Sequence, residues 1–334
     1  MSPPWIIHSP LDMHLHLRQD EMLRAIAPAS SRGFAGAVIM PNLVPPVDNL
    51  EALFAYREAI QRAIGQDVFT PYMTLFFRNY TAAELERAKP HIIGIKLYPE
   101  GVTTNSEDGV RDLREAHAVF DAMEQLEIPL LVHGETHGFV MDREREFTKI
   151  YDDLARRYPN LTIIMEHITT VEAVKLLDRH PRLHATVTLH HLLLTLDDMA
   201  GGLLNPHLFC KPLLKTPADR DALQEAVLAG HPKIMFGSDS APHPRHKKEC
   251  CGCAAGVFSA PVALSRLGGF FHSQGLSRLM QGFVSDHAQA IYGITPPVKR
   301  VELRPEPWRV PDEVGGVIPF LAGTHLPWRD VVVD

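Results

Sequence analysis

The chain has 334 residues, of which 45% are hydrophobic, and it carries a formal net charge of -7 with a pI near 6.2. A chain of this size can bury a large core as one big domain or two smaller ones. Its lysines and arginines are scattered and outnumbered by acidic residues, so we expect neither nucleic acid nor an anionic membrane as a partner.

The first ten residues, MSPPWIIHSP, lack the charged and apolar segments of a secretory signal. No apolar run reaches the ~18 residues of a membrane span. Three of the four cysteines, Cys250, Cys251 and Cys253, crowd into ECCGCAAG, which suits neither a disulfide framework nor a zinc finger with two distant ligand pairs. We therefore expect a cytoplasmic protein with reduced thiols.

Short apolar runs alternate along the chain with longer amphipathic segments. Eight runs are predicted strands: 11–16, 36–40, 71–76, 92–97, 129–133, 161–166, 183–188 and 233–237. The segments between them include helical patterns at 49–65, 109–128 and 170–181, long enough to cross over between parallel strands. Eight such units predict an α/β fold, a (β/α)8 TIM barrel that forms a single domain over residues 1–334 with a C-terminal extension from about residue 290. A doubly wound open sheet is the alternative, because it too buries parallel strands on both faces.

Polar side chains at the predicted strand ends favour the barrel. In a (β/α)8 barrel the catalytic groups lie at the carboxyl ends of several strands and face one mouth. Residues with metal-binding or acid-base side chains stand at or just after six of the eight ends: His14, His16, Asn42, Lys96, His133, His167 and Asp239. We expect them to form an active site.

The four histidines are informative only as a set. Alternation along a strand places His14 and His16 on one face, with Leu15 turned toward the helices. A lone H-x-H pair is more typical of the polar face of an edge strand, and His133 or His167 taken singly would be a core histidine bonded to a carbonyl. Buried imidazoles each need a partner, and a shared metal ion would supply all of them at once.

Asp239 and Lys96 each allow more than one interpretation. Asp239 could cap a helix, or it could ligate a metal through one oxygen and accept a proton from bound water through the other. Lys96 could form a Schiff base, bind a phosphate, or react with carbon dioxide to give a carbamate that bridges two metal ions. An ammonium would be repelled by metal cations, so the charge balance favours the carbamate.

Taken together, the motifs resemble those of one enzyme family. They are DMHLHLR, VIMPNLVPPV, KLYPEGVTTNSEDGV, PLLVHGE, EHITT, GSDSAPHPRHKKE, CGCAAGVFSAP and PFLAG. From about residue 5 to its end the chain is similar to the dihydroorotases of the shorter bacterial type, in the amidohydrolase superfamily. The resemblance implies reversible, zinc-dependent conversion of L-dihydroorotate to N-carbamoyl-L-aspartate in pyrimidine biosynthesis, carried out by a homodimer.

The resemblance also implies a metal centre with two Zn²⁺ ions per subunit. Its ligands would be His14, His16 and Asp239 for one ion and His133 and His167 for the other, with carboxylated Lys96 and a hydroxide as bridges. The hydroxide would be the nucleophile. Asp239 would be the general base and acid.

Substrate contacts follow from the same resemblance. Arg18, Asn42 and His243 would hold the substrate carboxylate. Thr103 and Thr104 would belong to a mobile loop that closes over the substrate, and the backbone of Ala254 and Lys211 would touch the ring. Arg18 suits its role because a guanidinium can bind a carboxylate with two parallel hydrogen bonds.

A few positions depart from the family pattern. Lys211 stands where relatives usually have leucine, the loop HGETHGFVMDRE is shorter than theirs, and TLHHLLLT lacks the usual proline. None of these is a predicted metal ligand. The alternatives are another cyclic amidohydrolase of the hydantoinase, dihydropyrimidinase or allantoinase type, a non-catalytic dihydroorotase-like scaffold, and a Schiff-base aldolase that uses Lys96.

Overall fold

Eight parallel strands form a single sheet in chain order. The computed structural model describes residues 3–101, 103–107, 109–110 and 113–333. The sheet runs in the order β2, β3, β4, β5, β6, β7, β8, β9, with bounds Leu11–Leu15, Gly36–Ile39, Thr70–Phe76, Gly94–Leu97, Leu130–Val132, Ile163–Met165, Leu183–Val187 and Ile234–Phe236. All eight predicted strands are therefore confirmed.

The sheet closes on itself between β2 and the residues that follow β9. The Asp239 amide donates to the His14 carbonyl at 2.9 Å, and the His16 amide donates to the Ser240 carbonyl at 3.2 Å. The strand order never reverses, which a doubly wound sheet would require. The predicted (β/α)8 barrel is confirmed, and the open-sheet alternative is wrong.

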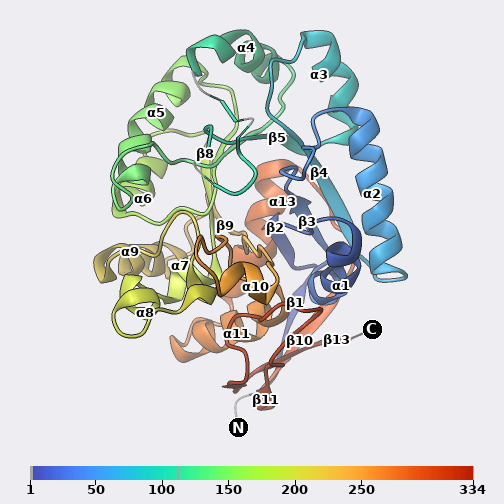
Figure 1. The fold of residues 1–334 in the computed structure, drawn as a ribbon, viewed down its shortest axis with the longest axis vertical. Coiled ribbons are helices and arrows are strands. Elements are labelled where there is room, and N and C mark those ends of the chain that lie inside the picture. The colour runs from blue at the N-terminus through green and yellow to red at the C-terminus, as the bar shows by residue number, and fades with distance from the viewer. Residues whose placement is uncertain (1–2, 102, 108, 111–112, 334) are drawn as a thin grey trace.

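Helices surround the barrel (Figure 1). They are α1 Asp20–Ser31, α2 Leu50–Ile64, α3 Ala82–Ala88, α4 His117–Gln125, α5 Arg143–Arg157, α6 Val171–Leu177, α7 Leu189–Leu193, α8 Leu196–Ala200, α9 Pro217–Leu228, α10 Arg245–Lys248, α11 Ala263–Ser273, α12 Leu279–Gln281 and α13 His287–Tyr292. Among the described residues, no helix has the length and apolar character needed to cross a membrane.

Local capping explains where several helices begin. The Asn49 side chain accepts from the Ala52 amide ahead of α2. Thr81 and Glu84 form a reciprocal capping box at α3, and Thr216 does the same with Asp219 at α9. The helix predicted for 109–128 is shorter than expected. The Val110 amide donates to the Tyr98 carbonyl, and among the described residues a 3-10 turn at Leu113–Ala116 precedes α4.

Two apolar layers hold the barrel together. The larger lies between strands and helices and includes Leu15, Ile95 and Leu97. The smaller fills the barrel interior with Leu11, Met13, Val38, Met40, Leu131, Ile164 and Met235, and α13 adds Ala288 to it. This apolar plug occupies the barrel interior and leaves the carboxyl ends of the strands for the polar residues.

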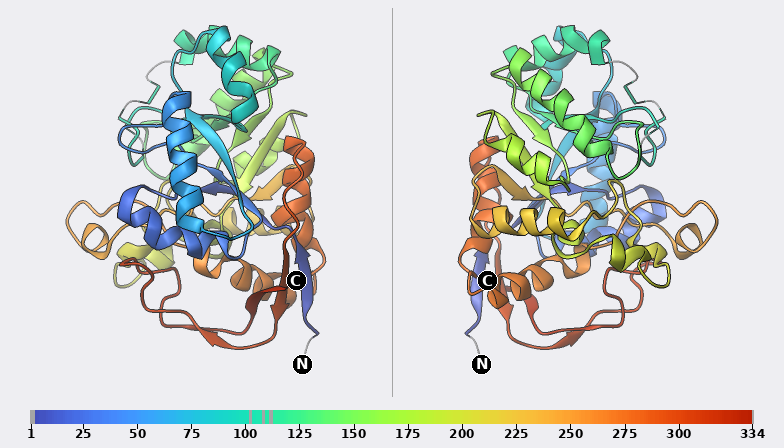
Figure 2. Two further views of the ribbon diagram at one scale, coloured as in Figure 1. Left: turned by 90° about the vertical axis from the view of Figure 1, so that its right-hand side faces the viewer. Right: turned by 90° about the vertical axis from the view of Figure 1, so that its left-hand side faces the viewer.

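The chain ends meet in a second, smaller sheet that the sequence did not reveal. Strand β1 (Trp5–His8) pairs antiparallel with β10 (Arg300–Arg304), which pairs in turn with β13 (Arg329–Val333). The short strands β11 (Trp308–Arg309) and β12 (His325–Leu326) pair with each other. Figure 2 shows this addition at the lower end of the molecule in both views. Strands β10 to β13 lie within the extension predicted from about residue 290, and β1 from the N-terminus pairs with β10.

Candidate metal centre

Most of the predicted site residues lie around one cavity at the carboxyl ends of the strands. The space between these residues, with the solvent at its open mouth included, is about 360 Å³. It is lined by His14, His16, Arg18, Asn42, Tyr98, Thr103, Thr104, His133, His167, Lys211, Asp239, Ala241, Ala255 and Gly256. The described residues that line it come from segments throughout the chain, so the fold brings the strand ends together as a barrel mouth does.

His14, His16 and Asp239 form the first half of the centre. The Asp239 Oδ1 atom lies 3.4 Å from His14 Nε2 and 3.1 Å from His16 Nε2. All three side chains are buried, and one ligand atom from each lies within 4.8 Å of the others. Two imidazole nitrogens and a carboxylate oxygen at this spacing can share one zinc ion.

A second carboxylate, that of Glu166, fixes which nitrogen of His14 carries a proton. His14 Nδ1 lies 2.7 Å from Glu166 Oε2, and a carboxylate can only accept, so Nδ1 carries the proton. Nε2 is then the nitrogen that faces the Asp239 oxygen and that a metal ion could bind. A carboxylate that orients a histidine in this way is common at metal sites.

His133 and His167 form the second half of the centre, and here too a glutamate binds one ring nitrogen. His133 Nε2 lies 2.8 Å from the buried Glu135 Oε2, so it donates there. Its Nδ1, the nitrogen left for a metal ion, lies 3.1 Å from His167 Nε2. The His167 and His14 ring centroids are 5.0 Å apart, so the two halves adjoin.

Lys96 lies beneath these groups on β5. It is fully buried, and its Nζ atom has no hydrogen-bond partner among the described residues. Burial lowers the pKa of the Lys96 ammonium to about 8, against the opposing pull of Glu166 and Asp239. A buried ammonium without a hydrogen-bond partner is costly, so this amine is suited to conversion into a ligand.

Burial also sets the protonation of the other ligands. It lowers the pKa of His16 to about 4 and that of His167 well below its usual value, which leaves both rings neutral and able to bind a metal. Burial alone would raise the pKa of Asp239, but the His16 hydrogen bond and the neighbouring His14 and His167 hold it well below its ordinary value. Asp239 is therefore ionised at neutral pH.

Irregular backbone conformations help to orient several of these side chains toward the cavity. The pairing of β2 with β3 shifts register between Asp12 and Leu15, so Met13 stays in the barrel interior while Leu15 packs under the helices. Such a bulge redirects the side chains around it. His167 and Asp239 both have φ of 43°, a conformation that few non-glycine residues adopt and that is frequent at functional sites.

Arg18 and His243 meet at the rim of the cavity. Arg18 Nε donates to the Pro242 carbonyl at 3.0 Å, and its Nη2 lies 3.0 Å from His243 Nε2. That same His243 nitrogen lies 2.9 Å from the Ala255 carbonyl. Burial lowers the pKa of His243 to about 3, and a single nitrogen of a neutral ring cannot both donate and accept, so only one of these two contacts is a hydrogen bond at a time.

The predicted loop lies against Asn42. Asn42 Nδ2 donates to the Thr104 carbonyl at 3.0 Å, and Asn105 Nδ2 donates to the Asn42 carbonyl at 3.0 Å. Thr103 and Thr104 both line the cavity. Among the described residues, Ala255 and Gly256 form the adjoining wall and Ala254 lies just outside it, with its amide bonded to the Lys247 carbonyl.

Sequence reasoning missed the residues that orient the ligands. Glu135 stands two positions after His133, and Glu166 directly precedes His167. An acidic residue beside each histidine was the available signal. It could not have shown that Glu166 serves His14, which lies 152 positions away in the chain.

Comparison with known proteins agrees with this geometry. Residues 4–250 match the model of the family described as Amidohydrolase. A curated dihydroorotase from Helicobacter hepaticus is 42% identical over 330 residues, or 96% of each chain. The crystal structure of dihydroorotase from Campylobacter jejuni is 49% identical with a TM-score of 0.94, covering 99% of this chain and 98% of that one. Dihydroorotase from Saccharomyces cerevisiae, solved in complex with 5-fluoroorotic acid, is 33% identical with a TM-score of 0.90 and covers 98% of this chain and 99% of its own.

Sequence identity at this level, over nearly the whole length of both compared chains, indicates a closer relationship than a shared fold. An L-hydantoinase from Arthrobacter aurescens shares the architecture with a TM-score of 0.84 at only 16% identity, which speaks for the barrel alone. The chain belongs to the amidohydrolase family and, within it, to the dihydroorotases.

Proposed function

We propose that this chain hydrolyses the ring amide of L-dihydroorotate to N-carbamoyl-L-aspartate, and closes the ring in reverse, as a step of pyrimidine synthesis. The observation that carries the proposal is the set of buried imidazoles beside Asp239, in which Glu166 holds one nitrogen of His14 and Glu135 holds one nitrogen of His133, so that the other nitrogen of each ring faces a neighbouring candidate ligand. The names of the similar dihydroorotases support the same reaction.

The proposed cofactor is a pair of Zn²⁺ ions. His14, His16 and Asp239 would hold one and His133 and His167 the other, with Lys96 carboxylated between them. The fit rests on the donor set and on the unpartnered Lys96 amine. When bound, the two ions would lower the pKa of a water molecule and polarise the amide carbonyl.

Asp239 is the residue proposed to move the proton. Its carboxylate is ionised, so it can accept the proton of the attacking water. As the bond between the carbonyl carbon and the ring nitrogen breaks, Asp239 returns that proton to the nitrogen. In the reverse direction it takes a proton from the ureido nitrogen while that bond forms.

Arg18, Asn42 and His243 are proposed to hold the carboxylate of the substrate. Arg18 and Asn42 line the cavity, and His243 lies within 3.0 Å of the guanidinium. The orotic acid analogue bound in the yeast structure is also a pyrimidine carboxylic acid. Hydantoin and dihydrouracil lack this carboxylate, so the site favours dihydroorotate over the substrates of the other cyclic amidohydrolases.

A turnover assay coupled to metal analysis tests the function. Purified protein should hydrolyse dihydroorotate and should convert N-carbamoyl-L-aspartate in reverse, with activity that falls in step with the metal content on chelation and returns when Zn²⁺ is added. Hydantoin and dihydrouracil serve as competing substrates in the same assay. Preference for either of them, or full activity without metal, would contradict the proposal.

The proposed binding of the substrate carboxylate by Arg18 gives a second prediction. Arg18→Lys should raise KM for dihydroorotate about ten- to hundredfold, with a smaller change in kcat, because a point charge replaces a planar fork that makes charge-assisted hydrogen bonds. Steady-state kinetics measures the split between the two constants. Arg24→Lys, at an exposed position on α1, is the matched control and should leave both constants unchanged.

A homodimer in the cytoplasm completes the proposal. The family resemblance suggests the dimer. Light scattering of the purified protein would test it, because a single chain has a mass of 37.3 kDa.

A further inference from the structure

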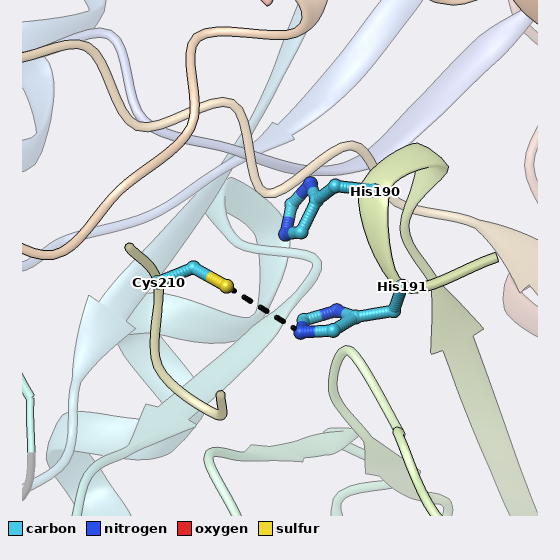
Figure 3. A group of neighbouring side chains, drawn as sticks. All are labelled: His190, His191 and Cys210. Carbon is cyan, nitrogen blue, oxygen red and sulfur yellow. Dashed lines mark hydrogen bonds between the residues drawn. The ribbon is translucent and has the colours of Figure 1, made fainter. Parts of the chain in front are cut away.

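A second group of potential metal ligands lies outside the catalytic centre. His190 and His191 stand on α7, and Cys210 stands on a separate segment that approaches them (Figure 3). All three side chains are buried, and one ligand atom from each lies within 4.8 Å of the others. None of the three belongs to the proposed catalytic ligands.

His190 is the observation that points to a ligand. Neither of its ring nitrogens has a hydrogen-bond partner among the described residues, although the side chain is fully buried. Figure 3 shows one of these nitrogens turned toward the space between the Cys210 sulfur and the His191 ring. A buried imidazole left without a partner is destabilising, so a bound group at this position would remove the cost.

The other three donor atoms are spaced roughly as ligands of one tetrahedral ion. The Cys210 Sγ atom lies 3.7 Å from His191 Nε2, and the Pro212 carbonyl oxygen lies 2.9 Å from that nitrogen and 3.3 Å from the sulfur. Ligands at about 2.0 to 2.3 Å from a tetrahedral zinc stand roughly 3.3 to 3.6 Å from one another. The observed separations lie within a few tenths of an ångström of this range.

The His191 tautomer can adapt to such an ion. In the absence of metal, Nε2 donates to the Pro212 carbonyl and Nδ1 faces the Thr188 hydroxyl at 2.9 Å. Moving the ring proton to Nδ1 frees Nε2 for the metal, and the Thr188 oxygen, which can both donate and accept, then becomes the acceptor. The Cys210 thiol loses its proton to solvent when the sulfur binds.

We propose that His190, His191 and Cys210, with the Pro212 carbonyl oxygen as fourth ligand, form a structural site for a third transition metal ion of the Zn²⁺ class. Two imidazoles and one thiolate are ligands that zinc and cobalt accept. The four proposed ligands fill a tetrahedral shell and include no carboxylate, so the site would be structural rather than catalytic.

The position of the site explains what the ion stabilises. Lys211 follows Cys210 and lines the catalytic cavity, and the Phe209 carbonyl before it accepts from the Gly256 amide at 2.8 Å. Gly256 lines the same cavity. An ion bound at Cys210 therefore fixes two segments of the cavity wall from behind.

Cobalt substitution tests the site with a signal that does not depend on turnover. The proposed catalytic ligands include no sulfur, so a sulfur-to-cobalt charge-transfer band can arise only from a cysteine. Protein produced in cobalt-supplemented, zinc-depleted medium should show this band and contain about one metal ion per chain more than the Cys210→Ser variant. His190→Gln should weaken or abolish the band, whereas His184→Gln, a matched change on β8, should leave it intact.

The other thiols provide the decisive control. Cys250→Ser, Cys251→Ser and Cys253→Ser, combined in one chain, leave Cys210 as the sole cysteine. The band should persist in this variant, which decides the question even if Cys210→Ser does not fold. Absence of the band from the cobalt-loaded wild-type protein, or its loss from the triple variant, would overturn the proposal.

Discussion

Asp239→Asn is expected to reduce kcat for dihydroorotate by about a thousandfold or more. Asparagine keeps an oxygen where Asp239 faces His14 and His16, so the ligand geometry is largely retained. It cannot accept and return a proton, and this loss acts on the bond-breaking step. Steady-state kinetics, with the metal content of the same preparation, measures the effect. Asp239→Ala should also lose nearly all turnover.

An exposed aspartate supplies the control for this change. Asp221 on α9 lies on the surface, and Asp221→Asn should leave kcat, KM and metal content unaltered. Should Asp239→Asn retain more than about a tenth of the wild-type kcat, a factor of ten being 1.36 kcal/mol in the barrier, Asp239 would not be the proton carrier.

Lys96→Ala is expected to cost turnover on a similar scale, about a thousandfold, together with part of the bound metal. The variant removes the amine that would carry the bridging carbamate and leaves a buried space among the imidazoles. Two cations without an anionic bridge repel each other strongly in a site shielded from water. A small carboxylic acid such as acetate fits the vacated space and supplies the missing charge, so it should restore part of the activity.

The carbamate itself can be observed. Wild-type protein equilibrated with ¹³C-labelled carbon dioxide should show a carbamate resonance that Lys96→Ala lacks and that the exposed control Lys175→Ala retains. Lys248 provides an internal comparison, because burial also lowers its pKa to about 8. Its Nζ atom donates to the carbonyls of Phe209, Ala254 and Gly256, so we expect no reaction there. A Lys96→Ala enzyme with near-normal kcat and metal content would refute the bridging role, and borohydride trapping of an aldehyde on Lys96 would favour the aldolase alternative.

The fold was predictable because each barrel strand has its own apolar run. β2 to β9 all fall within one or two residues of their predicted starts or ends, since strands buried on both faces are mostly apolar. The small sheet of β1, β10 and β13 was missed. Its strands are short, and Trp5 pairs with Leu303 across almost the entire chain. Nothing local to WIIH identifies so distant a partner.

The identity of the candidate ligands was likewise a local property. The sequence placed His14, His16, Lys96, His133, His167 and Asp239 at strand ends, where a barrel turns such groups toward one mouth. Simple alternation along β2 does not by itself account for the directions of His14 and His16. Met13 lies in the barrel interior and Leu15 in the outer layer, so the register shift in β2 contributes to the aim of the histidines.

The sequence by itself thus determined which residue types stand at which strand ends, because hydrophobic periodicity and strand termini are short-range properties. Only the tertiary structure decided which nitrogen of each ring faces the centre, since that depends on Glu166 bonding His14 and Glu135 bonding His133. The same holds for His190 and Cys210, whose meeting behind the cavity wall requires two separate segments to converge. Hydrogen bonds and metal sites depend on directions and distances fixed within tenths of an ångström, and those are set by packing between segments that no local pattern relates.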